Sequence, residues 1–150
     1  MIAVTVAYDL VFLVHVLAAV ATIVVLVTLR FAATALVRGA GADEQARRFP
    51  QRRNWAARVI HLLPVTGLYM TLTGDSSVSL TRPWVSTGLL CYVLAAGHLE
   101  ARTLPQERAI AEIVAKDGAP SVARGRQFMN SVNVLLALVG VALFAMLVQF

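Results

Sequence analysis

Cysteine, lysine and acidic side chains are all scarce in this chain. The 150 residues contain one cysteine, Cys91, which excludes an internal disulfide and a Cys-x-x-Cys redox pair. Charged residues make up only 14% of the chain, and a single lysine stands beside twelve arginines. A preference for arginine is typical of GC-rich genomes, so the composition indicates a bacterial protein. No Walker loop, nucleophile triad, zinc signature or dinucleotide fingerprint is present, which excludes the enzyme classes that carry them.

Apolar residues, in contrast, are abundant. They account for 59% of the chain, against roughly 45–50% in ordinary soluble domains. Mean hydropathy is +0.75. A small domain buries only about two-thirds of its surface, so a soluble fold of this length could not cover so much apolar surface. We therefore expect an all-α integral membrane protein that forms one domain over residues 1–150, with the lipid bilayer as its partner.

Four apolar segments predict four transmembrane helices, arranged as a four-helix bundle. Their expected limits are about 8–37, 55–73, 84–99 and 129–148. The charged segments 38–54 and 100–128 are predicted to be loops between them. The second loop contains an apolar stripe over Gln106–Lys116 that predicts an amphipathic helix.

Arginine and lysine are distributed very unevenly over the loops. Eleven of them flank the first and third loops, whereas the second loop carries only Arg82. By the positive-inside rule, loops 38–54 and 100–128 face the cytoplasm and both termini lie on the non-cytoplasmic side. This topology predicts a multi-pass protein of the bacterial inner membrane. It also accounts for the net charge of +5, and because no aromatic residues are interleaved with the basic ones, nucleic-acid binding is not expected.

Three histidines within the predicted spans are candidates for a functional site, because ionisable residues are costly inside a membrane. His15 lies about 9 Å below the outer edge, counted at 1.5 Å per residue. His61 and His98 lie in the opposite leaflet, toward the cytoplasm. His61 and His98 could together ligate haem b, and His15 could be an axial ligand with Met70 as its partner. The alternative is that these histidines are solvated or hydrogen-bonded to neighbouring helices.

A second candidate set lies toward the outer surface. His15, Met70, Cys91 and Met146 all fall roughly 6–10 Å below that surface when helical rise is counted from the ends of the spans. Imidazole, thioether and thiol are the soft ligands that hold Cu(I). Methionine and cysteine also fill ordinary apolar interiors, so packing is the alternative interpretation.

Arginines near the cytoplasmic edge are candidates for anion binding. Arg30 is expected to extend its guanidinium to the inner headgroups, or to pair with a haem propionate or a lipid phosphate. The two arginine pairs at 47–48 and 52–53 are expected to meet anionic lipids at the cytoplasmic face. A second copy of the chain or another membrane protein is a possible partner, although no interface signal is present.

Short motifs in all four spans resemble a known family group. Tyr8-Asp-Leu-Val-Phe-Leu-Val-His15 is followed by Arg30-Phe31, and Leu63-Pro-Val-Thr-Gly-Leu-Tyr69 lies in the second span. Trp84 opens the third span, and Arg126-Gln-Phe-Met-Asn130 leads into the last. With these motifs the chain resembles small bacterial membrane proteins related to the copper-resistance D domain and to the HemJ-type protoporphyrinogen oxidases.

The resemblance implies that His15 corresponds to the first-helix histidine that ligates b-type haem in the HemJ-type enzymes. Those enzymes carry a lysine shortly after the third-span tryptophan, where this chain has Ser86-Thr-Gly-Leu89. The missing lysine counts against protoporphyrinogen oxidation itself. The expected function is that of a haem-b electron-transfer or oxidoreductase protein, with a non-enzymatic accessory or copper-handling membrane subunit as the alternative. The sequence identifies no catalytic residue and leaves open whether the protein is an enzyme.

Overall fold

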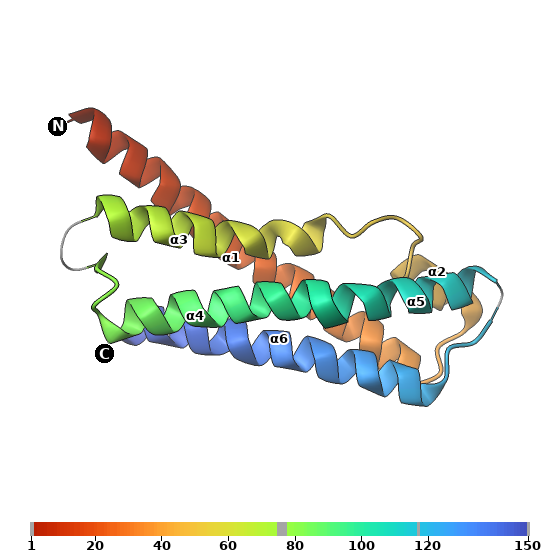
Figure 1. Ribbon diagram of the computed structural model, residues 1–150. Helices are drawn as coiled ribbons and strands as arrows, with labels where there is room; N and C mark the ends of the chain where they lie inside the picture. The colour runs from red at the N-terminus through yellow and green to blue at the C-terminus, as the bar shows by residue number, and fades with distance from the viewer. Residues whose placement is uncertain (1, 75–77, 117, 150) are drawn as a thin grey trace.

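The computed structural model of the chain describes residues 2–74, 78–116 and 118–149, with the side chains of residues 2–5 left aside. Over these ranges the protein is all-helical and contains no strand. Its elements are α1 (Ile2–Val37), α2 (Ala42–Arg48), η1 (Ala56–His61), α3 (Leu62–Thr73), α4 (Pro83–His98), η3 (Leu99–Thr103), α5 (Leu104–Ala115) and α6 (Val122–Val148). Both termini lie at the same end of the molecule (Figure 1).

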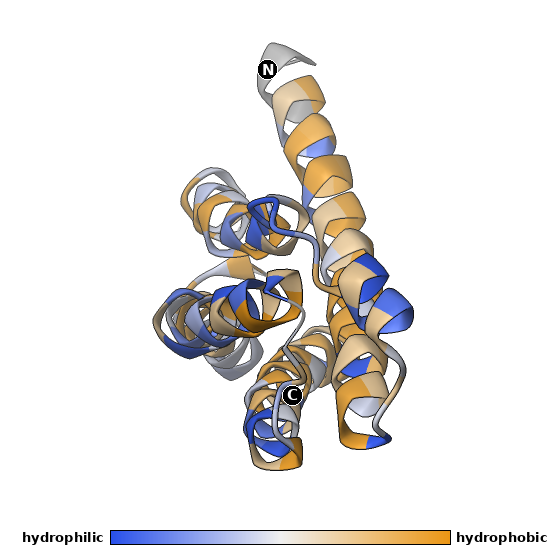
Figure 2. Cartoon of the chain, turned by 90° about the vertical axis from the view of Figure 1, so that its right-hand side faces the viewer, coloured by the Kyte–Doolittle hydropathy of each residue, from blue (hydrophilic) through white to orange (hydrophobic). Residues whose placement is uncertain are grey.

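Two helices, α1 and α6, are long and apolar enough to cross a membrane. The 27 residues of α6 extend about 40 Å at 1.5 Å per residue, which exceeds a hydrocarbon core of about 30 Å. In the apolar 18-residue stretch of each helix, only 22% of α1 and 33% of α6 is buried within the protein. Hydrophobic residues run along α1 on its outer faces as well (Figure 2). These helices therefore expose far more apolar surface than the core helix of a soluble domain does.

The helices are held by contacts between neighbours. α6 packs against both α1 and α4, and α3 packs against α1 and α4 in turn. Small residues let α1 and α6 approach closely: a Cβ placed on Gly125 would lie 3.1 Å from the Cβ of Leu36. Ala33 and Ala142 are fully buried as well. Close approach through small residues is the usual way in which helices associate in a membrane.

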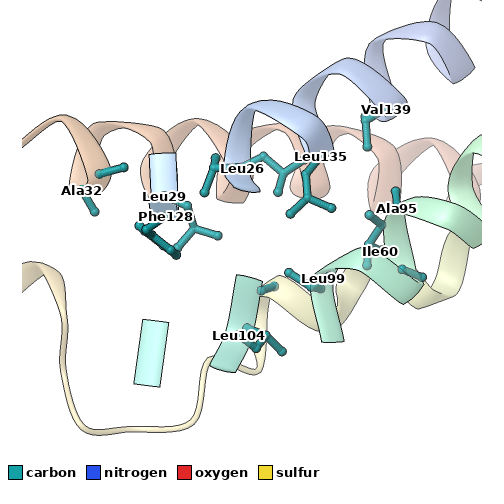
Figure 3. Packing of buried hydrophobic residues seen from close by; sticks show 14 of the residues in the cluster. Leu26, Leu29, Ala32, Ile60, Ala95, Leu99, Leu104, Phe128, Leu135 and Val139 are labelled. Carbon is teal, nitrogen blue, oxygen red and sulfur yellow. The ribbon is translucent and has the colours of Figure 1, made fainter. Parts of the chain in front are cut away.

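The core runs along the middle of the bundle and is built from α1, the segment after α2, η1, α3, α4, η3, α5 and α6. Ten of its members are labelled in Figure 3: Leu26, Leu29, Ala32, Ile60, Ala95, Leu99, Leu104, Phe128, Leu135 and Val139. Phe128 is fully buried, and its ring meets the edge of Phe49 at a centroid distance of 5.7 Å. Phe49 thereby ties the segment after α2 to α6.

Prolines explain two irregular helices that the sequence did not predict. The second predicted span begins as the 3₁₀ helix η1, and Pro64 follows shortly after it. The third predicted span continues through η3, a π-helical turn, into α5. Pro105 stands just after η3 and cannot donate a hydrogen bond to the carbonyl four residues earlier, so the regular ladder is interrupted there.

The predicted loops contain more helix than expected. The segment 38–54 includes α2, and the amphipathic helix expected over Gln106–Lys116 is observed as α5. The last helix begins at Val122, earlier than the expected residue 129. Ser121 explains this start, because its hydroxyl accepts a hydrogen bond from the Arg124 backbone N–H at 3.3 Å and so caps the helix.

Candidate functional site

His15 is the most buried of the three histidines. It lies on the face of α1 that packs against α3, and only 7% of its surface is exposed. Its Nδ1 is 2.7 Å from the hydroxyl oxygen of Thr66 on α3. The Tyr92 ring of α4 meets the imidazole edge-on at a centroid distance of 6.4 Å. Three helices therefore fix the orientation of this ring.

The hydrogen bonds of Thr66 determine which nitrogen of His15 carries the proton. The Thr66 hydroxyl is also 2.5 Å from the backbone carbonyl of Leu62, one turn earlier in the chain. A hydroxyl has one proton, and at this distance from a carbonyl oxygen it must donate there. Thr66 is then the acceptor for His15, so Nδ1 carries the hydrogen. The neutral imidazole keeps an unprotonated Nε2, which is the form that ligates a metal.

A cavity of about 200 Å³ adjoins His15. It opens between the N-terminal part of α1, the end of α3, the start of α4 and the end of α6. Its wall is mostly apolar and aromatic, with these lining residues: Tyr8, Phe12, His15, Leu63, Gly67, Met70, Thr71, Val78, Trp84, Val85, Leu89, Tyr92, Met146 and Gln149. Because Tyr8 near the start of α1 and Gln149 after α6 both line it, the cavity lies toward the end of the molecule that holds both termini.

Three members of the predicted copper set line this one cavity: His15, Met70 and Met146. The fourth, Cys91, is buried in the hydrophobic core cluster and is not among the lining residues. Among the described residues no three His, Cys, Asp or Glu side chains come together as a metal site. The thioethers of Met70 and Met146 are therefore the soft ligands that the cavity offers beside His15.

The same cavity tests the expected haem. The donor fits, because His15 is held through Nδ1 as haem-ligating histidines are. The space does not fit: about 200 Å³ is smaller than the roughly 300–1,000 Å³ of pockets that enclose drug-sized ligands, and a tetrapyrrole is larger than these. A single ion fits this volume. Haem binding accordingly stays a prediction from sequence, while the cavity favours a smaller ligand.

Arg30 does not belong to this site. It lies fifteen residues after His15 on the same helix, which is about 22 Å of helical rise. Its guanidinium donates to the Thr34 hydroxyl, and that hydroxyl donates in turn to the Arg30 carbonyl at 2.8 Å. Arg30 is half-buried against its own helix. It lies nearer than His15 to the end of α1 that the sequence predicts to be cytoplasmic.

His61 belongs to an ion-pair cluster at the start of the second helix. Its Nδ1 is 3.0 Å from the Arg58 carbonyl and its Nε2 is 3.7 Å from a Glu100 carboxylate oxygen. Arg58 donates two hydrogen bonds to Glu100, at 2.7 and 2.9 Å, and this pairing holds the pKa of Glu100 below its usual value. The π turn of η3 brings Glu100 to this position, where it links η1 to the end of α4.

His98 takes part in a different network. Its Nε2 is 3.0 Å from the hydroxyl of Ser131 on α6, and Ser131 is 2.8 Å from the hydroxyl of Thr103 on η3. The partners of His98 and His61 do not overlap within the described residues. A haem shared by the two histidines remains a prediction, and both side chains are already engaged in contacts between helices.

Glu107 on α5 is a half-buried carboxyl near the predicted cytoplasmic end. The Asn54 side-chain amide donates a hydrogen bond to it at 2.9 Å, and the Asn54 Oδ1 accepts from the Ala57 backbone N–H at 3.0 Å. Burial raises the pKa of Glu107, and the Asn54 hydrogen bond only partly offsets this. The folded state therefore holds its proton to a higher pH than the unfolded state does.

This raised pKa predicts a pH-dependent stability. Because the folded pKa lies above the unfolded value near 4.5, stability is lost as pH rises from there through the folded pKa. Glu107→Gln keeps the acceptor for Asn54 and removes the charge. We expect its Tm in detergent to exceed that of the wild type at pH 8 and to approach it at pH 4.5. Glu112→Gln, on the same helix but exposed, is the control, and a wild-type pH profile in the Glu107 variant would contradict the assignment.

Sequence reasoning missed Thr66 and Tyr92, the two residues that orient His15. Thr66 falls within the Leu63–Tyr69 motif, but a threonine in an apolar helix ordinarily bonds only to its own backbone, so its role depends on which helix lies opposite. No family model, curated protein sequence or solved structure matches this chain.

Proposed function

We propose that the chain is a four-span protein of the bacterial inner membrane, with both termini on the non-cytoplasmic side, that binds one Cu(I) ion in the cavity at His15. The observation that carries the copper proposal is the unprotonated Nε2 of a fixed, neutral imidazole in an apolar cavity that two methionines also line. The activity is copper handling: the ion is held at the outer side of the membrane for transfer.

Exposed apolar side chains on α3 and α4 support four spans rather than two. Val65 and Leu72 on α3 are 66% and 72% exposed, and Leu90 on α4 is 60% exposed. Side chains of this kind on α1, α3, α4 and α6 need lipid around them, because soluble proteins rarely expose large continuous apolar patches. The eleven basic residues that flank loops 38–54 and 100–128 support the orientation.

The donor set supports a monovalent soft ion. His15, Met70 and Met146 are all neutral, so they offer a bound cation no compensating charge. The cost of placing an ion in an apolar site rises with the square of its charge, which favours Cu(I) over divalent ions. Imidazole and thioether are also ligands that prefer Cu(I), whereas Mg²⁺ and Ca²⁺ need oxygen ligands. The apolar wall limits access of water to the ion.

Haem b is the second candidate, because the hydrogen-bonded Nδ1 of His15 is the arrangement that an axial ligand needs. It would require α1 to move away from α3 and α4 to enlarge the cavity. The chain would then serve electron transfer instead of copper handling.

One purified sample distinguishes the two candidates. Protein produced in copper-supplied cells and purified in detergent under reducing conditions is analysed for metal content and for its absorption spectrum. The proposal expects about one copper per chain that a Cu(I)-specific chelator removes, and no Soret band. A Soret band together with haem-bound iron would show that the ligand is haem and not copper. Colourless protein that retains no copper after anaerobic Cu(I) loading would leave only an accessory role.

A further inference from the structure

A groove rich in arginine lies at the end of the molecule opposite the His15 cavity. It has a volume of about 540 Å³. It is bounded by α1, by the end of α2 with the segment that follows it, and by α5. Its charged wall is formed by Arg47, Arg48, Arg52 and Arg53, which we call the arginine groove residues. All four are exposed. Arg48 forms an ion pair with Glu44 at 2.7 Å, whereas Arg47 and Arg52 have no ion-pair partner among the described residues.

The other wall of the groove is apolar. It is lined by the indole of Trp55, which is 64% exposed, and by the core residues Leu29 and Ala32 of α1, which are only 6% and 5% exposed. The guanidinium of Arg53 lies over this indole at 4.6 Å, and that of Arg58 at 5.2 Å. An exposed tryptophan fixed between arginines is typical of the headgroup level of a bilayer.

We propose that the arginine groove binds the phosphate of an anionic phospholipid from the inner leaflet, with an acyl chain against the exposed indole of Trp55. The shape of the site favours a lipid over a free phosphate because its guanidinium groups and its apolar wall form one continuous hollow. Guanidinium groups bind phosphate oxygens bidentately, so neighbouring arginines can hold one headgroup. The inference depends on the proposed membrane orientation but is independent of the copper site.

One carboxyl also lines the groove and opposes an anion there. Glu107 lies on the wall formed by α5, where Asn54 donates a hydrogen bond to it. Burial raises the pKa of Glu107, which favours its neutral form relative to that of an exposed glutamate. Arg48 is paired with Glu44, so Arg47, Arg52 and Arg53 give the groove its excess of positive charge.

The two tryptophans allow a direct test. Trp55 and Trp84 are the only ones in the chain, and Trp84 lines the cavity at the other end. Trp84→Phe leaves Trp55 as the single fluorophore beside the groove. This variant is reconstituted in phosphatidylcholine vesicles that contain a minor fraction of brominated lipid. We expect brominated phosphatidylglycerol to quench Trp55 about threefold or more efficiently than brominated phosphatidylcholine at the same fraction.

Matched arginine variants show whether the groove is responsible. Arg52→Gln with Arg53→Gln, in the Trp84→Phe background, is expected to bring the quenching ratio of the two brominated lipids close to one. Arg124→Gln with Arg126→Gln removes two exposed arginines from the start of α6 and should keep the wild-type ratio. Using the ratio cancels any change in Trp55 emission caused by loss of Arg53 from the ring.

Each other outcome overturns the proposal in a distinguishable way. Equal quenching by both lipids in the parent would show that the groove does not select anionic lipid. Loss of selectivity on addition of millimolar glycerol phosphate would identify a water-soluble phosphate as the ligand. Absence of quenching by either lipid would show that Trp55 is not at the bilayer, and would contradict the proposed membrane arrangement as well.

Discussion

Replacing His15 by alanine is expected to abolish Cu(I) binding. The imidazole is the only nitrogen ligand among the residues that line the cavity, and its loss leaves thioethers that bind Cu(I) weakly on their own. We expect an affinity loss of more than about 100-fold, beyond the roughly 10–100-fold that follows removal of a supporting hydrogen bond. Anaerobic competition with a chromogenic Cu(I) chelator measures this change in purified protein.

Thr66→Val distinguishes an oriented ligand from a histidine that merely lies nearby. Valine has the shape of threonine but cannot accept the Nδ1 hydrogen bond, so the ring loses the contact that fixes its tautomer and orientation. We expect Cu(I) affinity to fall about 10–100-fold while the fold is retained. His98→Ala, which removes a histidine bonded to Ser131 in a separate network, is the control and should bind as the wild type does. Equal binding by His15→Ala and His98→Ala would remove the basis of the copper proposal.

The contrast between Met146 and Cys91 shows what the sequence could and could not establish about this site. Counting helical rise gives the depth of a residue in the membrane, and by depth alone His15, Met70, Cys91 and Met146 were equivalent. It does not give the direction in which a side chain points, because that depends on which helices are neighbours. The packing of α4 against α6 places Cys91 in the core cluster, while Met146 lines the cavity.

Hydropathy predicted the long helices well and their ends less well. α1 and α6 were expected from apolar length alone, and both are observed as single helices. Local chemistry determined the rest: Ser121 caps α6, which begins seven residues before the predicted span, and Pro105 follows a π turn where a helix end was expected. These signals are single residues in polar segments, where apolar periodicity carries no information.

Phe49 lies outside the helices as predicted, but its burial was not foreseen, and this burial leads to the largest expected change in stability. Phe49 was assigned to a polar loop, yet it is only 2% exposed and packs against the fully buried Phe128. Phe128 lies among core residues of several elements (Figure 3), so no single neighbour can move to fill its place. We expect Phe128→Ala to lower the free energy of unfolding by about 3–5 kcal/mol, as for other buried phenylalanines.

Phe144 provides a matched control on the same helix. It is 60% exposed, and in the proposed arrangement it faces lipid, so its removal leaves no cavity within the protein. We expect Phe144→Ala to change stability in detergent by no more than about 0.5 kcal/mol. Denaturant unfolding of both variants in the same detergent compares their free energies of unfolding. Phe49→Ala should lose part of the stability that Phe128→Ala loses, because it removes one ring of the Phe49–Phe128 contact. Removing a ring that faces lipid should cost much less than removing a ring enclosed by protein. Similar losses for Phe128→Ala and Phe144→Ala would therefore contradict the described interior of the protein. They would also contradict the packing of the 38–54 segment against it.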